Sequence, residues 1–404
     1  MRVLMVAPGT RGDVAPMAGL GSRLAPLGFE VSIAANPAYA DLVAAAGCGY
    51  RGLPGDMGPL VMPAPAGHKP SAADLRRYFN ALGEYMELAA KGTLAAAQAG
   101  TDIILANSVA PYAYDVAEAM EVPALGAHLQ PMEPSSAYPP VVLGSTRSLG
   151  PVGNKLLGSL IAAGKAPYDA PAAQLRRELG LGRLSRPAAE RRRRRAHQRT
   201  LHGFSRHVLP APRDWHSGLS VDGYWWAPED QKFSPTKQLE QFIADGPPPV
   251  FIGFGSSQAL DADFMVSTAR RAGVRAVLQG VEGIDEPDVL SIGTVPHHWL
   301  FEQMAAVVHH AGAGTTAAGL RAGVPTVAVP IFTDQPLWAS RIFKLGAGPA
   351  PVPYKNLTSE DLAEAIKLAV ADESYTLGAR RIASLLNAED SVTPVIEALR
   401  VAQL

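Results

Sequence analysis

Cysteine is almost missing from this sequence, which contains only Cys48. A single thiol excludes an internal disulfide. Long apolar runs are missing too: no stretch reaches the roughly 18 residues that a membrane-spanning helix needs. Met1 leads straight into a strand-like segment with no charged leader before it. These absences predict a cytoplasmic protein without an integral membrane segment.

An excess of charge of either sign is also missing. The 36 Lys and Arg residues nearly cancel the 37 Asp and Glu residues, so the molecule as a whole has no field that would attract nucleic acid or an anionic membrane. Partners must therefore be argued from local sites, and we expect small molecules and no nucleic acid. The sequence leaves the oligomeric state open.

One local exception is the run of five arginines at 191–195, in what looks like an exposed helix. It has two interpretations: contact with anionic lipid or nucleic acid, or a solvated helix face near an interdomain connection. We favour the solvated face, because the flanks lack the apolar face of a membrane-lying helix.

The pattern of the first half is typical of an α/β domain. Buried strand-like runs at 3–6, 30–35, 102–108 and 122–129 alternate with segments whose apolar residues recur at helical spacing. Such alternation predicts a parallel sheet with right-handed crossovers. A chain of 404 residues with 47% apolar residues suits two domains of about 200 residues each.

The alternation restarts after a proline-rich join near residue 230. The sequence therefore predicts two Rossmann-like domains, 1–230 and 231–404, with the option that the last helix returns to the first domain. Two segments, 55–70 and 133–155, are too rich in glycine and proline for helix or central strand. Each either borders an acceptor pocket or is a variable surface loop.

The segment VVHHAGAGTTAAGLRAGVPTVAVPIFTDQP, 307–336, is the most informative. A buried strand ends at His309 and His310, small residues follow, and Thr315 begins a helix. Exposed amides and the positive end of a helix dipole favour a phosphate, and His310 adds another donor. The alternative is that any strand-to-helix connection needs small residues.

Two polar residues follow the next strand of this segment. Asp334 and Gln335 should lie at the same carboxyl edge of the sheet as the phosphate loop. A carboxylate and an amide there can bind paired hydroxyls of a sugar.

This segment resembles the donor-binding signature of family 1 glycosyltransferases. Their GT-B fold is α/β, with two Rossmann-like domains whose parallel sheets face each other across a cleft. PHHWLFEQMAAVVHHAGAGTTAAGLRAGVP is especially similar to sterol glucosyltransferases and to bacterial enzymes that glycosylate glycopeptides and other natural products. The resemblance is close over about 250–350 and the first twenty residues, and loose in the middle of the first half.

The resemblance implies roles for named residues. It assigns the donor diphosphate to Ser256, Ser257, His310, Gly312, Gly314 and Thr315. It assigns the donor sugar to Asp334 and Gln335, and the donor base to a stretch containing Val295, His298 and Trp299. Trp299 has the alternative of a core residue, because this chain lacks the longer tryptophan motif of plant relatives.

The loop PGTRGDVAP resembles the GTRGD loop of the natural-product subgroup, in which the aspartate is the proposed catalytic base. At the end of the first strand, Asp13 would point into the crevice between domains and accept the proton of the acceptor hydroxyl. The alternative is that Asp13 caps the following helix. Plant relatives use a histidine here, so it stays open whether His128 shares the task. We expect His128, Tyr78 and Met86 to border the acceptor.

The implied activity is inverting transfer of a hexose from UDP-glucose or a dTDP-sugar to a hydroxyl of an apolar natural product, without cofactor or metal. The DAD at 261–263 matches a metal-binding motif of another glycosyltransferase class, but helix capping explains it more simply. The alternative function is a GT-B protein that binds a nucleotide sugar without transferring it, either epimerase-like or an accessory binder.

Overall fold

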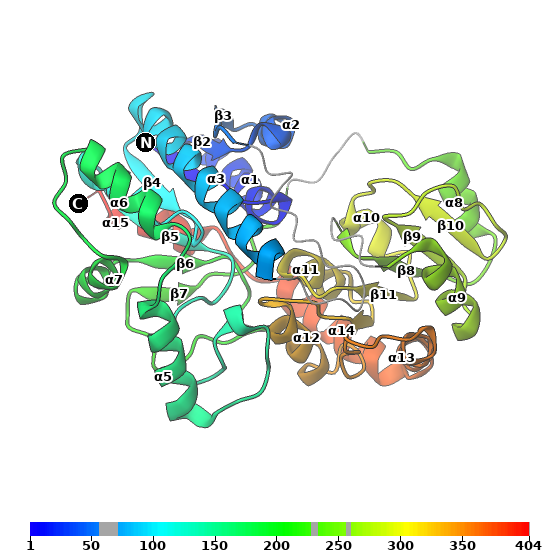
Figure 1. Ribbon diagram of the computed structural model, residues 1–404. Coiled ribbons are helices and arrows are strands. Elements are labelled where there is room, and N and C mark those ends of the chain that lie inside the picture. Colours follow the sequence, from blue (N-terminus) through cyan, green and yellow to red (C-terminus); the bar gives the residue numbers. More distant parts are fainter. Residues whose placement is uncertain (56–71, 228–232, 256–259, 404) are drawn as a thin grey trace.

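The protein is described here from a computed structural model that covers residues 1–55, 72–227, 233–255 and 260–403. Two parallel sheets, one of seven strands and one of five, each carry helices on both faces and lie side by side (Figure 1). The prediction of an α/β protein with two Rossmann-like halves is therefore confirmed. No helix among the described residues is long and apolar enough to cross a bilayer.

The first sheet has the strand order β3-β2-β1-β4-β5-β6-β7, with all neighbours parallel. Its strands are β1 Arg2–Ala7, β2 Glu30–Ala35, β3 Gly49–Gly52, β4 Ile103–Ala106, β5 Ala124–His128, β6 Thr200–His202 and β7 Leu219–Val221. Its helices are α1 Arg11–Leu24, α2 Ala40–Ala45, α3 Ala72–Gln98, α4 Ala113–Ala119, α5 Gly150–Ala163, α6 Asp169–Glu178 and α7 Arg186–Arg195. The prediction that 133–155 holds no helix is wrong at its end, because α5 begins at Gly150 and a proline is tolerated in its first turn.

Alternating side chains of β1 fill two different cores. Val3 and Met5 pack on the face covered by α1, whereas Leu4 and Val6 pack on the face covered by α3 and α4. A parallel strand buried on both faces needs apolar residues at every position, which is why this segment is a continuous apolar run without alternation.

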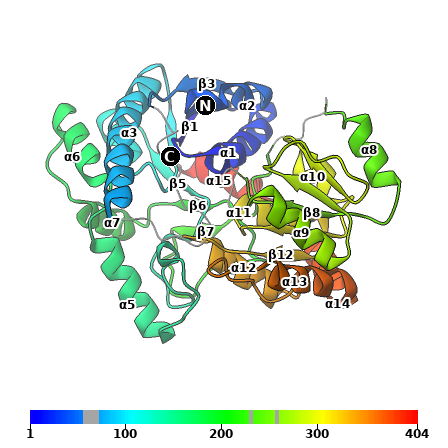
Figure 2. The same ribbon diagram turned by 45° about the vertical axis from the view of Figure 1, so that its right-hand side comes forward.

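The second sheet has the order β10-β9-β8-β11-β12 and is also parallel throughout (Figure 2). Its strands are β8 Val250–Gly253, β9 Ala276–Gln279, β10 Val289–Ile292, β11 Ala306–His309 and β12 Thr326–Ala328. The helices that follow the first domain are α8 Lys237–Ala244, α9 Ala262–Ala272, α10 His297–Phe301, α11 Ala313–Ala322, α12 Gln335–Lys344, α13 Ser359–Ala371, α14 Glu373–Asn387 and α15 Thr393–Val401.

The last helix crosses back to the first domain. Val395, Ala398 and Leu399 of α15 are buried in the same core as β1 and α1, and the red helix lies among the blue and cyan elements in Figure 1. The predicted boundary near residue 230 falls on 228–232, outside the described residues.

A further apolar cluster joins the domains: Phe204 of the first packs edge-on to Trp338 of the second, with ring centroids 5.6 Å apart.

The strand orders locate the candidate site. Each order reverses at one point, between β1 and β4 in the first sheet and between β8 and β11 in the second. In open parallel sheets, ligands bind outside the carboxyl ends of the strands at this reversal. The segments directly after these four strands carry Asp13, in the first turn of α1, and Asn107, Gly255 and His310.

Candidate functional site

Asp13 is part of a capping box at the start of α1. The backbone N–H of Thr10 donates to Oδ2 of Asp13 at 2.9 Å, and the N–H of Gly12 donates back to Oγ1 of Thr10 at 3.3 Å. Gly9 leaves room for the carboxylate, because a Cβ there would lie 1.9 Å from Oδ2 of Asp13. The capping interpretation is thus confirmed, and a role as base stays a prediction beside it.

The surroundings of Asp13 raise its pKa toward neutral pH while leaving most of the carboxyl ionised at pH 7. Burial raises the pKa of Asp13 to about 6, and the charge of Asp334 in the other domain adds to the increase. Nδ2 of Asn107 donates to Oδ1 of Asp13 at 3.4 Å and opposes it. The side chain remains partly exposed. A half-accessible carboxylate with a pKa near 6 is suited to accept a proton at neutral pH.

The loop after β11 presents the start of α11. Ala311 has a left-handed backbone with φ 62°, unusual for a residue with a Cβ. Gly312 is the N-cap and offers no side chain to the amides of the first turn. Gly314 is exposed and Thr315 half-buried. The open amides and the helix dipole form a site for an anion.

His310 lies against this helix start. A Cβ on Gly312 would come within 2.6 Å of Nε2 of His310, so the glycine makes space for the ring. Nδ1 of His310 is buried and has no hydrogen-bond partner among the described residues. Burial lowers the pKa of His310 to about 4. At neutral pH the ring is therefore neutral and can donate through one nitrogen.

His309 points the other way, into the fold. Its Nδ1 accepts from the N–H of Ala311 at 2.9 Å, and the residue is fully buried. Burial also lowers the pKa of His309 well below its usual value. His309 therefore shapes the loop that presents His310.

Asp334 and Gln335 begin α12 at the neighbouring strand end, as the sequence predicts. Trp338 Nε1 donates to Oδ2 of Asp334 at 2.7 Å, and Thr333 Oγ1 donates to Oδ1 at 3.1 Å. Oε1 of Gln335 accepts from the N–H groups of Ile331 and Phe332 at 2.8 and 3.1 Å. The amide oxygen of Gln335 thus holds the loop, while its NH₂ group and the remaining acceptor capacity of Asp334 are left for the predicted sugar contact.

The predicted base-binding stretch lies on and before α10. Val295 and Trp299 pack against an apolar cluster of the second domain, and Trp299 meets Phe233 with ring centroids 5.5 Å apart. This packing favours the core interpretation of Trp299. His298 is only partly buried.

His297, which the sequence analysis did not name beside His298, lies at the start of α10 next to the predicted base-binding residues. Its ring stacks on Phe301 at 4.4 Å. Burial lowers the pKa of His297 to about 4, and the charges of Arg11 and His310 act in the same direction. His297 thus lies near both α1 and the phosphate loop. Its signal was weak, because two adjacent histidines at a helix start do not show which one turns inward.

The predicted acceptor-side residues come from β5 and α3. Tyr78 is half-buried on α3 and meets Phe79 edge-on at 5.6 Å. Met86 lies deeper, in the core beneath α3. His128 ends β5, and His202 ends β6 directly beside it in register. The 55–70 segment lies outside the described residues except for its first residue.

A half-buried carboxylate joins the two histidines. Glu133 accepts at one oxygen from Nδ1 of His128 at 2.8 Å, and at the other from Nε2 of His202 at 2.9 Å. The second nitrogen of His202 faces the carbonyl of Ser220 at 2.8 Å. The charge of Glu133 raises the pKa of His202 against the effect of burial, and the two histidines lower the pKa of Glu133. The sequence analysis missed Glu133 and His202. His202 reaches His128 through the register of β6 with β5, and Glu133 reaches both through the turn that follows β5.

Among the described residues, these three side chains also form the group that could hold a metal ion, since their ligand atoms lie within 4.8 Å of one another. Their N–O distances are those of hydrogen bonds, with one carboxylate oxygen on each ring. The geometry is that of an ion-paired bridge between two imidazoles.

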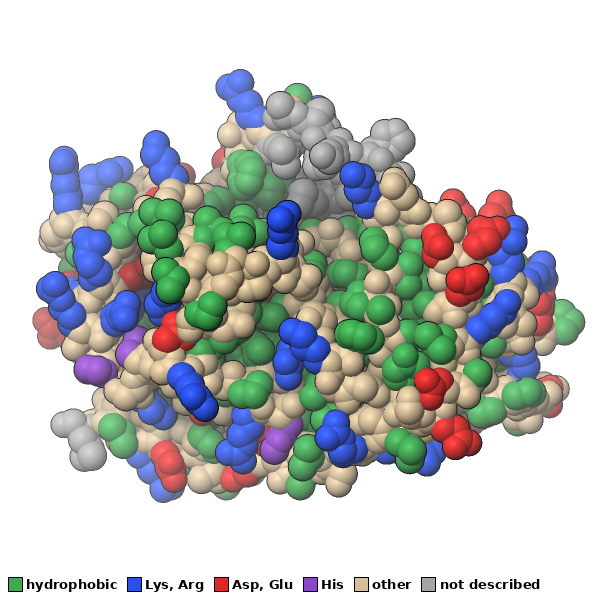
Figure 3. Space-filling view, turned by 90° about the horizontal axis from the view of Figure 1, so that it is seen from below, with side chains coloured by type: hydrophobic (Ala, Val, Ile, Leu, Met, Phe, Trp, Pro, Cys, Tyr) green, Lys and Arg blue, Asp and Glu red, His purple; other side chains and the backbone are tan. Residues whose placement is uncertain are grey.

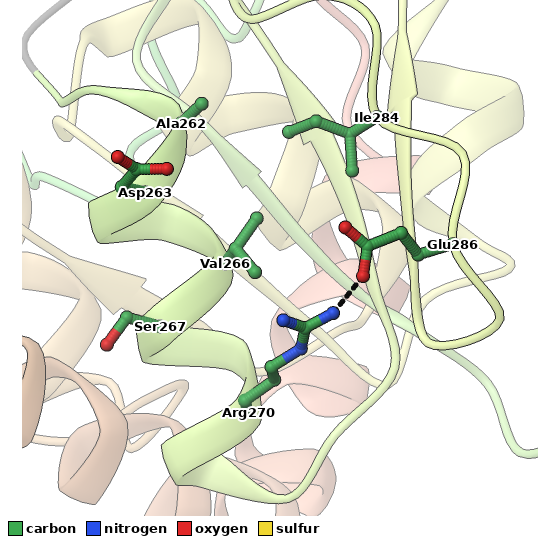
Figure 4. A pocket seen from close by; sticks show the side chains of 7 residues that line it. All are labelled: Ala262, Asp263, Val266, Ser267, Arg270, Ile284 and Glu286. Atoms are coloured by element: carbon green, nitrogen blue, oxygen red, sulfur yellow. Dashed lines mark hydrogen bonds and ion pairs between the residues drawn. The ribbon is translucent and has the colours of Figure 1, made fainter.

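Asp261 of the DAD motif caps α9: its Oδ1 accepts from the N–H of Phe264 at 2.8 Å. The simpler interpretation of that motif is therefore confirmed. Asp263 lines a shallow pocket between α9 and the 284–286 loop, which an ion pair between Arg270 and Glu286 crosses (Figure 4). None of the predicted donor residues lines it. Ser256 and Ser257 lie outside the described residues.

Comparison with known sequences gives a family and full-length relatives. Residues 255–401 match the family described as "Erythromycin biosynthesis protein CIII-like, C-terminal domain". The chain is 34% identical to O-mycaminosyltylonolide 6-deoxyallosyltransferase of Streptomyces fradiae, over 97% of this chain and 95% of that protein. It is 30% identical to a sterol 3-beta-glucosyltransferase of Arabidopsis thaliana, over 98% of this chain and 65% of that protein.

Solved structures share the fold along the whole chain. The glycosyltransferase of kitacinnamycin superposes with a TM-score of 0.71 at 17% identity, covering 99% of this chain and 98% of that one. The glycosyltransferase VinC, solved in complex with dTDP, superposes with a TM-score of 0.69 at 20% identity and covers 100% of both chains. The arrangement of the two domains is therefore that of the GT-B glycosyltransferases.

Proposed function

This chain belongs to the GT-B glycosyltransferases that include the deoxyallosyltransferase of Streptomyces fradiae, and we propose that it moves a hexose from a nucleoside diphosphate to a hydroxyl of an apolar natural product. One observation carries the proposal. Asp13, at the edge of the first sheet, is close enough to Asp334, at the edge of the second, for the charge of Asp334 to raise its pKa. Helix α1, whose first turn carries Asp13, also contacts α11 of the second domain, and this proximity supports pairing the proposed base with the proposed donor site.

The reaction follows as a single displacement. The acceptor hydroxyl gives its proton to the carboxylate of Asp13 while its oxygen forms a bond to the anomeric carbon. On the opposite side of that carbon, the bond to the diphosphate oxygen breaks and its electron pair leaves with the diphosphate. Attack from the face opposite to the leaving group inverts the anomeric centre. A positioned base is worth about 10² to 10⁴ in rate.

The leaving diphosphate would be stabilised by the start of α11 and by His310. A neutral imidazole is suited to this task, because it donates a hydrogen bond and stays unprotonated over the whole neutral range. Fixed amides and a dipole at the point where negative charge develops need no rearrangement during the reaction. The proposed reaction needs no metal ion.

Names of relatives support the substrate classes. The Streptomyces relative is named for transfer of a deoxyallose to a tylonolide, and the plant relative for glucosylation of a sterol. Both acceptors are apolar polycycles or macrocycles, and VinC was solved with dTDP. We therefore propose an apolar acceptor and a UDP- or dTDP-linked hexose as donor.

The test separates transfer from mere binding. The purified protein is incubated with UDP-glucose or a dTDP-hexose and a panel of macrolide, sterol and polyketide aglycones, and products are identified by mass spectrometry. We expect a mass increase of one hexose on an aglycone, with release of nucleoside diphosphate only when that aglycone is present. Tight donor binding without any transferred sugar across the panel would favour the alternative of a non-transferring binder.

A further inference from the structure

Helix α5 turns an apolar stripe toward solvent. Leu149, Val152, Leu156 and Leu160 recur at helical spacing and are 56%, 81%, 60% and 61% exposed. The opposite face of α5 packs on the fold, where a Cβ on Gly158 would contact Pro134. Surface helices normally bury their apolar stripe against another element, whereas the stripe of α5 is not covered by any described part of the chain.

The stripe is the densest such region of the described chain. The described residues include seventeen exposed large apolar side chains, and six of these fall between residues 142 and 160. Val142 and Leu143, in the turn before α5, are 45% and 50% exposed. Scattered exposed apolar residues need no explanation, but a cluster of this density marks an interaction site.

The same part of the chain is strongly cationic. Residues 141–199 contain 13 Lys and Arg against 3 Asp and Glu, whereas the rest of the chain contains 23 against 34. The near-zero net charge of the whole molecule therefore hides a positive lobe in the first domain. Figure 3 shows this polarity: blue side chains crowd the left half of that face, beside green ones, and red ones gather on the right.

Only some of these cations are used inside the fold. Arg176 pairs with Asp115 and Glu118, and Arg192 also pairs with Glu118. Seven others are exposed and form no ion pair with a described residue: Arg147, Lys165, Arg177, Arg183, Arg191, Arg194 and Arg195. Their charge is available to an external partner.

The cations and the stripe belong to adjoining helices. Arg186, in the first turn of α7, donates to the carbonyls of Ala162 and Gly164 at the end of α5. The arginine run of α7 lacks an apolar face of its own, and α5 supplies one from outside its sequence neighbourhood. Together they have the two components of an interfacial membrane site, apolar side chains and a basic cluster.

We propose that this lobe docks on an anionic lipid membrane, with the α5 stripe in the interface and the basic residues of 141–199 on the lipid headgroups. A second copy of this chain is a less favourable partner than a membrane, because its own positive lobe would repel the first. Nucleic acid would use the arginines but leave the stripe unpartnered. Lipid satisfies both, because acyl chains accept the apolar residues and anionic headgroups attract each basic residue near the surface.

Docking here would also bear on the reaction. This consequence rests on the proposed function, whereas the lipid binding itself does not depend on it. The 133–149 segment that supports α5 follows β5, whose last residue is His128 on the acceptor side. The membrane would then meet the molecule next to the expected acceptor pocket. An apolar acceptor dissolved in the bilayer would have a short path to it.

The experiment is flotation of the purified full-length chain with vesicles. We expect binding to phosphatidylcholine vesicles that contain phosphatidylglycerol, little binding to pure phosphatidylcholine, and loss of binding as salt rises. Arg191→Gln/Arg194→Gln/Arg195→Gln should lower the partition coefficient roughly a hundredfold, from about fivefold per charge. Val152→Gln/Leu156→Gln/Leu160→Gln keeps every basic residue but should still lower binding to the anionic vesicles at low salt, because it removes the apolar side chains that enter the interface. The matched control is Leu377→Gln on α14, which is 66% exposed and should bind like wild type.

Three results would overturn the proposal. The first is no difference between anionic and neutral vesicles. The second is a dimer in analytical ultracentrifugation that the α5 variant converts to monomer, which would make the stripe an interface between copies. The third is binding to duplex DNA that the arginine variant loses and the α5 variant keeps, combined with no vesicle binding. Hexose transfer to a water-dissolved acceptor, measured in the same variants, distinguishes failed docking from failed catalysis.

Discussion

At the scale of single residues, Asp13 combines two tasks with different chemical demands. The capping hydrogen bond from Thr10 needs only a side-chain oxygen, which asparagine also has. Proton transfer needs the ionised carboxylate. Because the folded-state pKa of about 6 lies above the ordinary 3.8, ionising Asp13 costs the fold stability as pH rises between these values.

We expect Asp13→Asn to fold and bind donor normally but to transfer sugar at least about a hundredfold more slowly. In the wild type, kcat/KM should fall as pH drops below about 6, because Asp13 becomes protonated and can no longer accept a proton. Steady-state rates across pH check both points. A variant that keeps most of its turnover when chemistry is rate-limiting would make Asp13 a cap only, and His128 the next residue to test.

His310→Ala should weaken binding of the nucleoside diphosphate by about 1.5 to 3 kcal/mol, the worth of a hydrogen bond to a charged group. The loss of affinity in His310→Ala relative to wild type should be the same at pH 6 and pH 8, since the pKa of His310 is held near 4 and the ring is neutral at both. Calorimetry with UDP and dTDP measures both. His207→Ala, a half-buried histidine away from the loop, is the control. Equal affinity in His310→Ala and wild type would remove His310 from the site.

At the scale of elements, the start of α11 can hold the ring of His310 only because Gly312 has no side chain. Gly312 has an ordinary backbone, so its role is space: a Cβ would come within 2.6 Å of Nε2 of His310. We therefore expect Gly312→Ala to displace the ring and lower nucleotide affinity about as much as His310→Ala does. Gly83→Ala, where a Cβ meets no atom within 4 Å, is the control. Unchanged affinity in Gly312→Ala would show that the ring can move without cost.

Elements also mark what the sequence could and could not predict. Strands and the glycine-rich loop follow local patterns, so their positions and the placement of Asp13, His310 and Asp334 at carboxyl edges were predictable. The bridge of His128, Glu133 and His202 was not, because it depends on the register of β5 with β6 and on the fold of the following turn. The apolar stripe of α5 beside the arginines of α7 is likewise a tertiary juxtaposition.

At the scale of the whole molecule, the proposed chemistry needs no metal ion. Dialysis against EDTA should therefore leave the transfer rate unchanged, and elemental analysis should find no stoichiometric zinc. The test bears on the His128, Glu133 and His202 group, whose ligand atoms are close enough for a cation. A rate that falls with EDTA and returns with a divalent ion would contradict metal-independent transfer. Glu133→Gln, which removes one anionic ligand, would then reveal whether this group binds the ion.

The path of the chain gives the first domain a helix that follows the whole second domain in sequence. α15 follows the whole second domain in sequence, yet Leu399 is fully buried in the core of the first, with β1 and α1. Leu399→Ala should lower the free energy of unfolding by about 2 to 5 kcal/mol, because it removes buried methyl groups and leaves a cavity. Val401→Ala on the same helix is the matched control, since Val401 is 64% exposed and should change stability little. Calorimetry should show that Leu399→Ala lowers the transition of the first domain, and that added dTDP, bound by the second, raises mainly the other transition. Equal melting of both variants would mean that α15 does not hold the first domain in solution.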